Sequence, residues 1–428
     1  MAKNATNKVS VWQSLRNAWK VNDIRQKLIY TFVMLVLFRL VSVIPAPGVD
    51  YAKLGLAETE LPMLQLMNMM TGNAFSQMTI MAMGVSPYIN SSIIMQLLTI
   101  AIPALERMQK SGPDGQKKIA QITRYVTVVL AELQASGLVS SIGVIKAGWF
   151  NVVLVGVSMA AGTALAMWIG ERITEKGIGN GISLLIFVGI VSNLFNGYSN
   201  LLLTAIAQPT VGNWLRFVGV LLLALVIILV VTFIDMGVRR INVNYAKRVS
   251  GRKMYGGQSS IIPLKVVSVG VLPLIFAYSF MAFPATIIQL AAPNSGLAAW
   301  WTQNMSATSP LYMIICALLI VAFTYFYSSI SFQPDEMAKN IQQQGGAIPS
   351  VRPGKPTADY LKRINSRLIL FAALFLAVLA TLPNIITEAA KVNIPFAASS
   401  MLIAVSVALE TKRQLDDMLV ARNYDTLS

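Results

Sequence analysis

The stretch GVSPYI (residues 84–89) has a near copy, GVLPLI (residues 270–275), in a second apolar part of the chain. Proline removes a helical hydrogen bond and glycine weakens a helix, so both copies predict a bend inside an otherwise apolar helix. A second motif also occurs twice, as SLLI (183–186) and SMLI (400–403), and the copies of the two motifs alternate along the chain in the same order. These collinear copies indicate that the chain consists of two related halves.

The composition is that of an integral membrane protein. Of the 428 residues, 55% are hydrophobic and only 12% are charged, and the mean hydropathy is +0.62. Several apolar stretches are long enough to cross a hydrocarbon core of ~30 Å as a helix. The hydropathy predicts ten spans, near 28–46, 78–103, 120–142, 150–170, 181–204, 214–237, 267–291, 309–330, 367–390 and 397–411.

The distribution of Lys and Arg predicts that both termini are cytoplasmic. The exceptions to this bias are Lys53, Lys146, Arg216 and Lys391 on the opposite side and Arg39 within a span. Because five spans per half is an odd number, the second half enters the membrane upside down relative to the first. This is the inverted-repeat architecture, which places a transport pathway at the interface between the repeats.

We therefore expect an all-α polytopic membrane protein with ten transmembrane helices in two inverted five-helix halves. The predicted parts are an amphipathic N-terminal segment (1–27), the two halves (28–207 and 208–411) and a C-terminal tail (412–428). Two long basic loops, at about 238–266 and 331–366, lie on the predicted cytoplasmic face. Loops of this length usually carry function, here the docking of an acidic or helical partner, although they could be topology signals alone.

An isoleucine ends each copy of the two motifs, at Ile89, Ile186, Ile275 and Ile403. If the repeat is real, these side chains converge near the centre of the membrane. A ring of aliphatic side chains at a constriction excludes water and ions yet deforms around a larger substrate. The alternative for any one of them is an ordinary core residue.

A methionine-rich stretch precedes Gly72 and is too short to span the membrane. Methionine is flexible and fills irregular gaps, so a re-entrant half-helix at about 62–77 is predicted to act as a removable plug. A fixed re-entrant filler is the alternative. The predicted plug residues are Met63, Met67, Met69, Met70 and Gly72.

The chain has few of the side chains on which enzymes and ion-coupled transporters depend. The chain has no histidine and one cysteine, and its few intramembrane charges are Arg39, Glu132, Asp235 and Glu388. The GIGNG stretch (177–181) is predicted to be a turn between spans, and RPGKPT (352–357) lacks the context of a phosphate-binding loop. We expect no enzyme activity and no cofactor, and hence an external energy source bound at the basic loops.

These features together resemble the SecY family, central subunits of bacterial protein-conducting translocons, over essentially the whole chain. The motifs that carry the resemblance are AMGVSPYINSSIIMQLL, GERITEKGIGNGIS, VNYAKR, GVLPLIFAYSF, FTYFY and VRPGK. The resemblance implies a ten-helix clamshell whose halves hinge between spans five and six. It also implies a pore ring formed by Ile89, Ile186, Ile190, Ile275 and Ile403.

The resemblance further implies a lateral gate, a docking surface and a set of partners. Spans two, three, seven and eight would form the gate through which hydrophobic segments enter the lipid, with Asn90, Ile94, Gln134, Ser279 and Phe283 as gate residues. The two long loops would dock the SecA motor ATPase or the ribosome through Arg239, Arg240, Lys247, Arg248 and Arg352. The other implied partners are SecE, SecG, signal-bearing precursor polypeptides and membrane lipid.

The expected function is therefore a channel for unfolded polypeptides in the bacterial cytoplasmic membrane. Two alternatives stay open. One is a secondary transporter for a small solute, which would depend on Glu132 and Glu388. The other is an accessory member of the same family dedicated to a few substrates.

Overall fold

A computed structural model describes residues 16, 18–50, 71, 72, 74, 76–142, 148–245, 248–250, 253–255, 259–291, 295–305, 309–390 and 398–425. The chain divides into two compact units. Unit 1 comprises Met1–Pro209, Ala282–Ser306 and Ile403–Ser428, and unit 2 comprises Thr210–Met281 and Ala307–Leu402. The predicted boundaries of the two halves stay a prediction.

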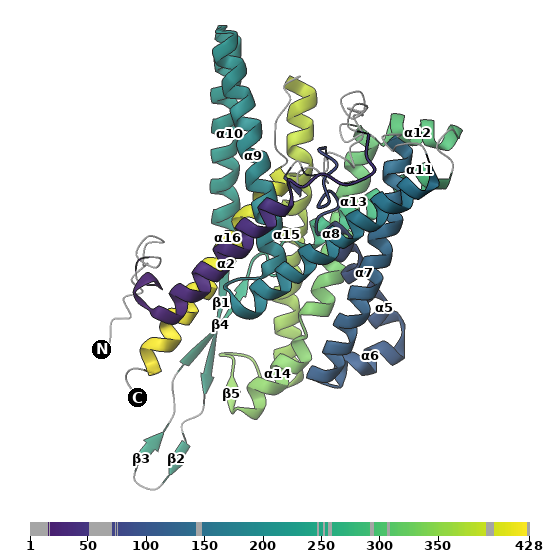
Figure 1. The fold of residues 1–428 in the computed structure, drawn as a ribbon. Helices are drawn as coiled ribbons and strands as arrows, with labels where there is room; N and C mark the ends of the chain where they lie inside the picture. Colours follow the sequence, from purple (N-terminus) through teal and green to yellow (C-terminus); the bar gives the residue numbers. More distant parts are fainter. Residues whose placement is uncertain are drawn as a thin grey trace. The chain divides into compact units, whose positions relative to one another are not determined.

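Unit 1 is helical (Figure 1). Its helices are α2 (Asn22–Val41), α5 (Ser86–Ala101), α6 (Pro103–Lys110), α7 (Pro113–Ile142), α8 (Trp149–Lys176), α9 (Gly181–Ala207) and α12 (Gly296–Asn304). Helix α7 packs against α5 and α8, and α8 also packs against α9 and α2. The axis bends by 102° between α5 and α6, because Ile102 is extended and Pro103 begins a new helix.

Unit 2 contains α10 (Val211–Asp235), α13 (Pro310–Ser331), α14 (Pro334–Gln343) and α15 (Lys355–Ala390). Two further helices, α11 (Leu272–Ala291) and α16 (Ala398–Asp425), are divided between the units. The last part of α11 and most of α16 are assigned to unit 1. Helix α15 packs against both α13 and α14.

The two long loops contain strands as well as turns. Strand β1 (Val238–Tyr245) pairs antiparallel with β4 (Ser259–Lys265) and β5 (Gly346–Ala347), in the order β4-β1-β5. A separate hairpin joins β2 (Arg248–Ser250) to β3 (Lys253–Tyr255). The sheet adds to the largely helical fold that the hydropathy predicts, because hydropathy detects membrane spans but not short polar strands.

A small apolar core holds these strands against α14 and α15. Alternate residues of β1, Ile241 and Val243, are buried and contact a cluster formed with Ile341, Ile348 and Leu361. Figure 1 shows β5 and α14 beside the first turns of α15. The two loops of unit 2 therefore form one folded substructure with a defined surface.

A described helix overlaps each of the ten expected spans. Among the described residues, five helices are long and apolar enough to cross a membrane, and the bent pair α5 and α6 would make a sixth. The five are Trp149–Lys176, Gly181–Ala207, Val211–Asp235, Pro310–Gln343 and Lys355–Leu382. The protein is a membrane protein by this measure, and the count of ten spans stays a prediction.

The bends predicted at the two Gly-Val-x-Pro motifs are corrected by the structure. Helix α5 begins at Ser86 and α11 at Leu272, so Pro87 and Pro273 occupy first-turn positions rather than helix interiors. Proline is tolerated there, because the N–H groups of the first turn have no helical partner. Each motif thus begins a helix.

Candidate functional site

The two Gly-Val-x-Pro motifs share a left-handed glycine and the same turn hydrogen bond. Gly84 and Gly270 have positive φ angles of 52° and 63°, and each amide donates a hydrogen bond to the carbonyl three residues earlier. A left-handed residue of this kind reverses the chain direction, and glycine adopts it at no steric cost. The helix that follows then holds Ile89 or Ile275 at its fourth position, where its amide donates to the carbonyl of Val85 or Val271.

All five isoleucines predicted to form the pore ring are buried. Ile186 and Ile190 lie four residues apart on α9 and therefore share one helical face. Ile89, Ile186, Ile190 and Ile403 belong to unit 1, whereas Ile275 belongs to unit 2. Convergence of the five side chains into one ring stays a prediction.

The chain before α5 is fixed to unit 1 by backbone contacts. We call its described residues (71, 72, 74 and 76–85) the pre-α5 segment. The amide of Ala46 donates to the carbonyl of Met78 (3.1 Å), and that of Ile80 donates to the carbonyl of Ile44 (2.9 Å). On its other side this segment lies against α8, where a Cβ added to Gly162 would be 2.1 Å from the carbonyl oxygen of Ile80. Only glycine at position 162 permits this approach.

A guanidinium joins the start of the pre-α5 segment to two helices. Arg39 of α2 donates from Nη2 to the carbonyl oxygen of Gly72 (3.2 Å) and also to the hydroxyl of Ser192 on α9. Gly72 is thus the predicted plug residue that the structure describes. Four further predicted plug residues lie outside the described residues: Met63, Met67, Met69 and Met70.

The predicted lateral-gate residues lie on three helices. Asn90 and Ile94 share a face of α5, Gln134 lies on α7 and Ser279 on α11, and all four are partly exposed. Phe283 belongs to α11, but its side chain lies outside the described residues. The contact between α5 and α7 is within unit 1, and the gate itself stays a prediction.

Helices α11 and α13 meet through aromatic rings that the sequence analysis did not single out. Phe276 packs edge to face against Phe323 and Tyr327, with both ring centroids at 5.9 Å, and Phe280 packs against Phe323 at 6.0 Å. Edge-to-face pairs of this kind add to the stabilisation from burial alone. Their sequence signal was present in GVLPLIFAYSF and FTYFY, but helix pairing cannot be read from either motif alone.

The predicted docking arginines lie on the folded substructure of unit 2. Arg239 and Arg240 are exposed at the start of β1, paired with Leu264 and Pro263 of β4. Arg352 is exposed just before α15, and its carbonyl oxygen accepts a hydrogen bond from Thr357 Oγ1 (2.8 Å). Arg248 begins β2, and Lys247 lies outside the described residues.

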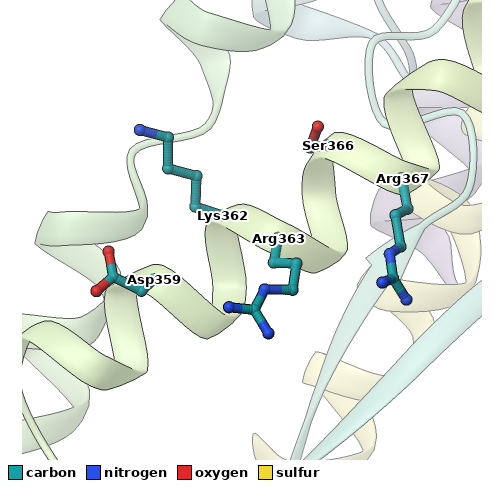
Figure 2. A pocket seen from close by; sticks show the side chains of 5 residues that line it. All are labelled: Asp359, Lys362, Arg363, Ser366 and Arg367. Atoms are coloured by element: carbon teal, nitrogen blue, oxygen red, sulfur yellow. The ribbon is translucent and has the colours of Figure 1, made fainter.

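A basic face of α15 adds cations that the sequence analysis missed. Lys362, Arg363 and Arg367 line an open depression together with Asp359 and Ser366 (Figure 2). In Figure 2 Arg363 and Arg367, one helical turn apart, extend from the same side of α15. The cations are visible in the sequence KRINSR (362–367), but hydropathy predicts most of this stretch to be a loop, whereas the structure places it in α15.

The glycine-rich turn between α8 and α9 has a structural explanation. Asn180 accepts a hydrogen bond from the Ser183 amide (3.2 Å) and so caps α9, and Ile178 donates its amide to Thr31 Oγ1 (3.0 Å). The predicted turn between two helices is confirmed. Within the part of the chain that the structure describes, no three metal-ligating side chains gather.

The relationship to known proteins follows from two sequence comparisons. The model of the family described as SecY matches residues 79–412. A protein translocase subunit SecY from Streptomyces galbus is 41% identical over 430 residues, which cover 95% of this chain and 98% of that protein. The chain belongs to the SecY family. A SecY subunit from Corynebacterium glutamicum is 42% identical over 443 residues, covering 96% of this chain and 98% of that protein.

Solved channel structures share the fold of this SecY family member. "The structure of a protein conducting channel" matches with a TM-score of 0.68 at 21% identity, and "Sec61 in the Canine ribosome-channel complex from the endoplasmic reticulum" with 0.65 at 19%. A third structure, described as "The plug domain of the SecY protein stablizes the closed state of the translocation channel and maintains a membrane seal", matches with 0.66 at 21%. Each match covers 92% of both chains.

Proposed function

We propose that this protein is the protein-conducting channel subunit of a translocon. It moves unfolded secretory polypeptides across the membrane and releases transmembrane segments sideways into the lipid. The observation that carries this proposal is the identity of about two residues in five with translocase subunits over almost the whole chain. Its role is passage rather than catalysis, so no reacting group is required.

The channel is sealed by an apolar constriction and a plug. Ile89, Ile186, Ile190, Ile275 and Ile403 form the constriction, which resists ions because water is excluded from a narrow aliphatic ring. The matching turns of the two Gly-Val-x-Pro motifs support this proposal, since each holds its isoleucine at the same place in a new helix. The methionine-rich stretch before Gly72 is the plug, as in the related channel whose plug maintains a membrane seal.

Lateral release uses the faces of spans two, three, seven and eight. Asn90, Ile94, Gln134, Ser279 and Phe283 line this gate. The edge-to-face contacts of Phe276 with α13 support a model in which α11 and α13 move together, because aromatic packing ties these two helices to each other.

The energy source docks on the basic surface of unit 2. Arg239, Arg240, Lys247, Arg248 and Arg352, extended by the cations of α15, attract an acidic surface of the SecA motor ATPase or the RNA of a ribosome. One structural relative was solved in a ribosome-channel complex, which supports the second partner. SecE and SecG are the proposed membrane partners. The proposed location of the protein is the bacterial cytoplasmic membrane, with both termini in the cytoplasm.

The test is photo-crosslinking from a probe at Ile275 to a secretory precursor stalled midway through transport. A crosslink that depends on the precursor's signal sequence supports passage through the constriction. A probe at Leu318, which is exposed on α13, serves as the control for lipid-facing positions. Robust crosslinks near Arg352 with none at Ile275 would contradict the proposal, and saturable uptake of a small solute would favour the transporter alternative.

A further inference from the structure

One intramembrane cation connects three separate parts of unit 1. Arg39 lies in the last turn of α2, and its Nη2 donates to Gly72 of the pre-α5 segment and to Ser192 of α9. Each terminal guanidinium nitrogen carries two hydrogens, so Nη2 can donate to both acceptors at once. The partners are 33 and 153 residues away in sequence, and the contact therefore depends on the folded unit.

The backbone at Gly72 is shaped around this guanidinium. Gly72 has a φ of 65°, and a Cβ added there would lie 2.6 Å from Arg39 Nη1 and 3.1 Å from the carbonyl oxygen of Gly189. Any side chain at position 72 would therefore displace the guanidinium or the backbone of α9. Gly72 is held between Arg39 and α9 by close approach as well as by a hydrogen bond.

The charge of Arg39 makes this contact costly to break. Arginine stays protonated in proteins, and a cation within a membrane span needs hydrogen-bond acceptors. Among the residues that the structure describes, Arg39 forms no ion pair with a carboxylate, and it donates to one carbonyl and one hydroxyl. Moving the Gly72 carbonyl away would take from Arg39 one of these two acceptors among the described residues.

We propose that Arg39 is a positioning residue that latches the end of the plug to α9 in the closed channel. This inference rests on the proposed function, because it assigns the position of the plug to a specific contact. The latch consists of Arg39, the Gly72 carbonyl and Ser192. Displacement of the plug requires its release, so the latch sets how strong a signal sequence must be to open the channel.

The experiment uses the native complex containing the full chain, reconstituted into liposomes. The variants are Arg39→Met, Arg39→Lys and Ser192→Ala. Their matched controls are Arg216→Met, an exposed arginine of α10, and Ser199→Ala, seven residues from Ser192 on the same face of α9. The measurements are ion leak, transport of a normal precursor, transport of a precursor with a defective signal, and thermal stability.

The latch predicts a gain of function. Losing a charge-assisted hydrogen bond should raise leak and defective-precursor transport by about tenfold or more in Arg39→Met. Smaller rises are expected in Ser192→Ala and in Arg39→Lys, which keeps the charge but not the planar fork. Both controls should behave as the unmodified protein does. A residue with a merely structural role would lower the transport of both precursors.

The latch would be overturned if Arg39→Met and Ser192→Ala transport the normal precursor as the unmodified protein does and show no rise in ion leak or in transport of the defective precursor. If Arg39→Met fails to fold, Ser192→Ala and Arg39→Lys decide the question, because each removes less. If the unmodified protein moves no precursor at all, the proposed function is wrong. The leak comparison alone then decides whether Arg39 fixes the segment.

Discussion

Replacing Gly162 with alanine should push the pre-α5 segment away from α8. The new Cβ would lie 2.1 Å from the carbonyl oxygen and 2.7 Å from the carbonyl carbon of Ile80. These are backbone atoms that the hydrogen bond to Ile44 holds in place, so no flexible side chain can yield. Overpacking of this kind costs about 1–3 kcal/mol, which offsets the gain of ~1 kcal/mol from replacing glycine in a helix and outweighs it over most of that range.

The matched control is Gly219→Ala on α10. A Cβ at Gly219 meets nothing within 4 Å, so this variant should gain the helix-propensity term alone. The helix-propensity gain is common to both variants, so they should differ by the overpacking cost of about 1–3 kcal/mol in free energy of unfolding, with Gly162→Ala the less stable. Thermal unfolding in detergent and ion leak in liposomes measure both consequences. The reasoning is refuted if Gly162→Ala is as stable as Gly219→Ala and leaks no more than the unmodified protein.

Three further predictions concern the other contacts. Leu361→Ala removes a fully buried side chain from the core beneath β1 and should lower the free energy of unfolding by about 2–5 kcal/mol, which faster hydrogen exchange in β1 would show. The control Leu370→Ala, at an exposed position on the same helix, should change little. Arg124→Gln breaks a 2.7 Å ion pair with Glu171 whose side chains are 46% and 32% exposed, so the loss of stability should stay below about 1 kcal/mol; a larger loss would show that α7 and α8 depend on this pair. Arg352→Glu should depress partner-driven transport at unchanged thermal stability, because the side chain is exposed, and normal transport would remove Arg352 from the docking surface.

The sequence by itself predicted which apolar stretches enter the membrane and marked two sites at which the helix pattern is interrupted. Long apolar stretches predict spans because only a helix satisfies its own backbone polar groups in lipid. The Gly-Val-x-Pro copies marked both sites at which the chain turns and a helix starts. Their exact effect was mispredicted, since a proline signals either a kink or a first turn, and local sequence does not distinguish the two.

Only the tertiary structure decided which distant residues meet. Arg39 was visible in the sequence as an isolated intramembrane charge, but its acceptors lie 33 and 153 residues away. The glycine at 162 likewise reads as one of many until the carbonyl of Ile80 is placed against it. The sheet order β4-β1-β5 joins two loops that α11, α12 and α13 separate in the sequence. Hydropathy indicates whether a segment lies in lipid or in water, and local motifs indicate where a helix starts. Contacts between segments depend on side-chain packing, which no single stretch encodes.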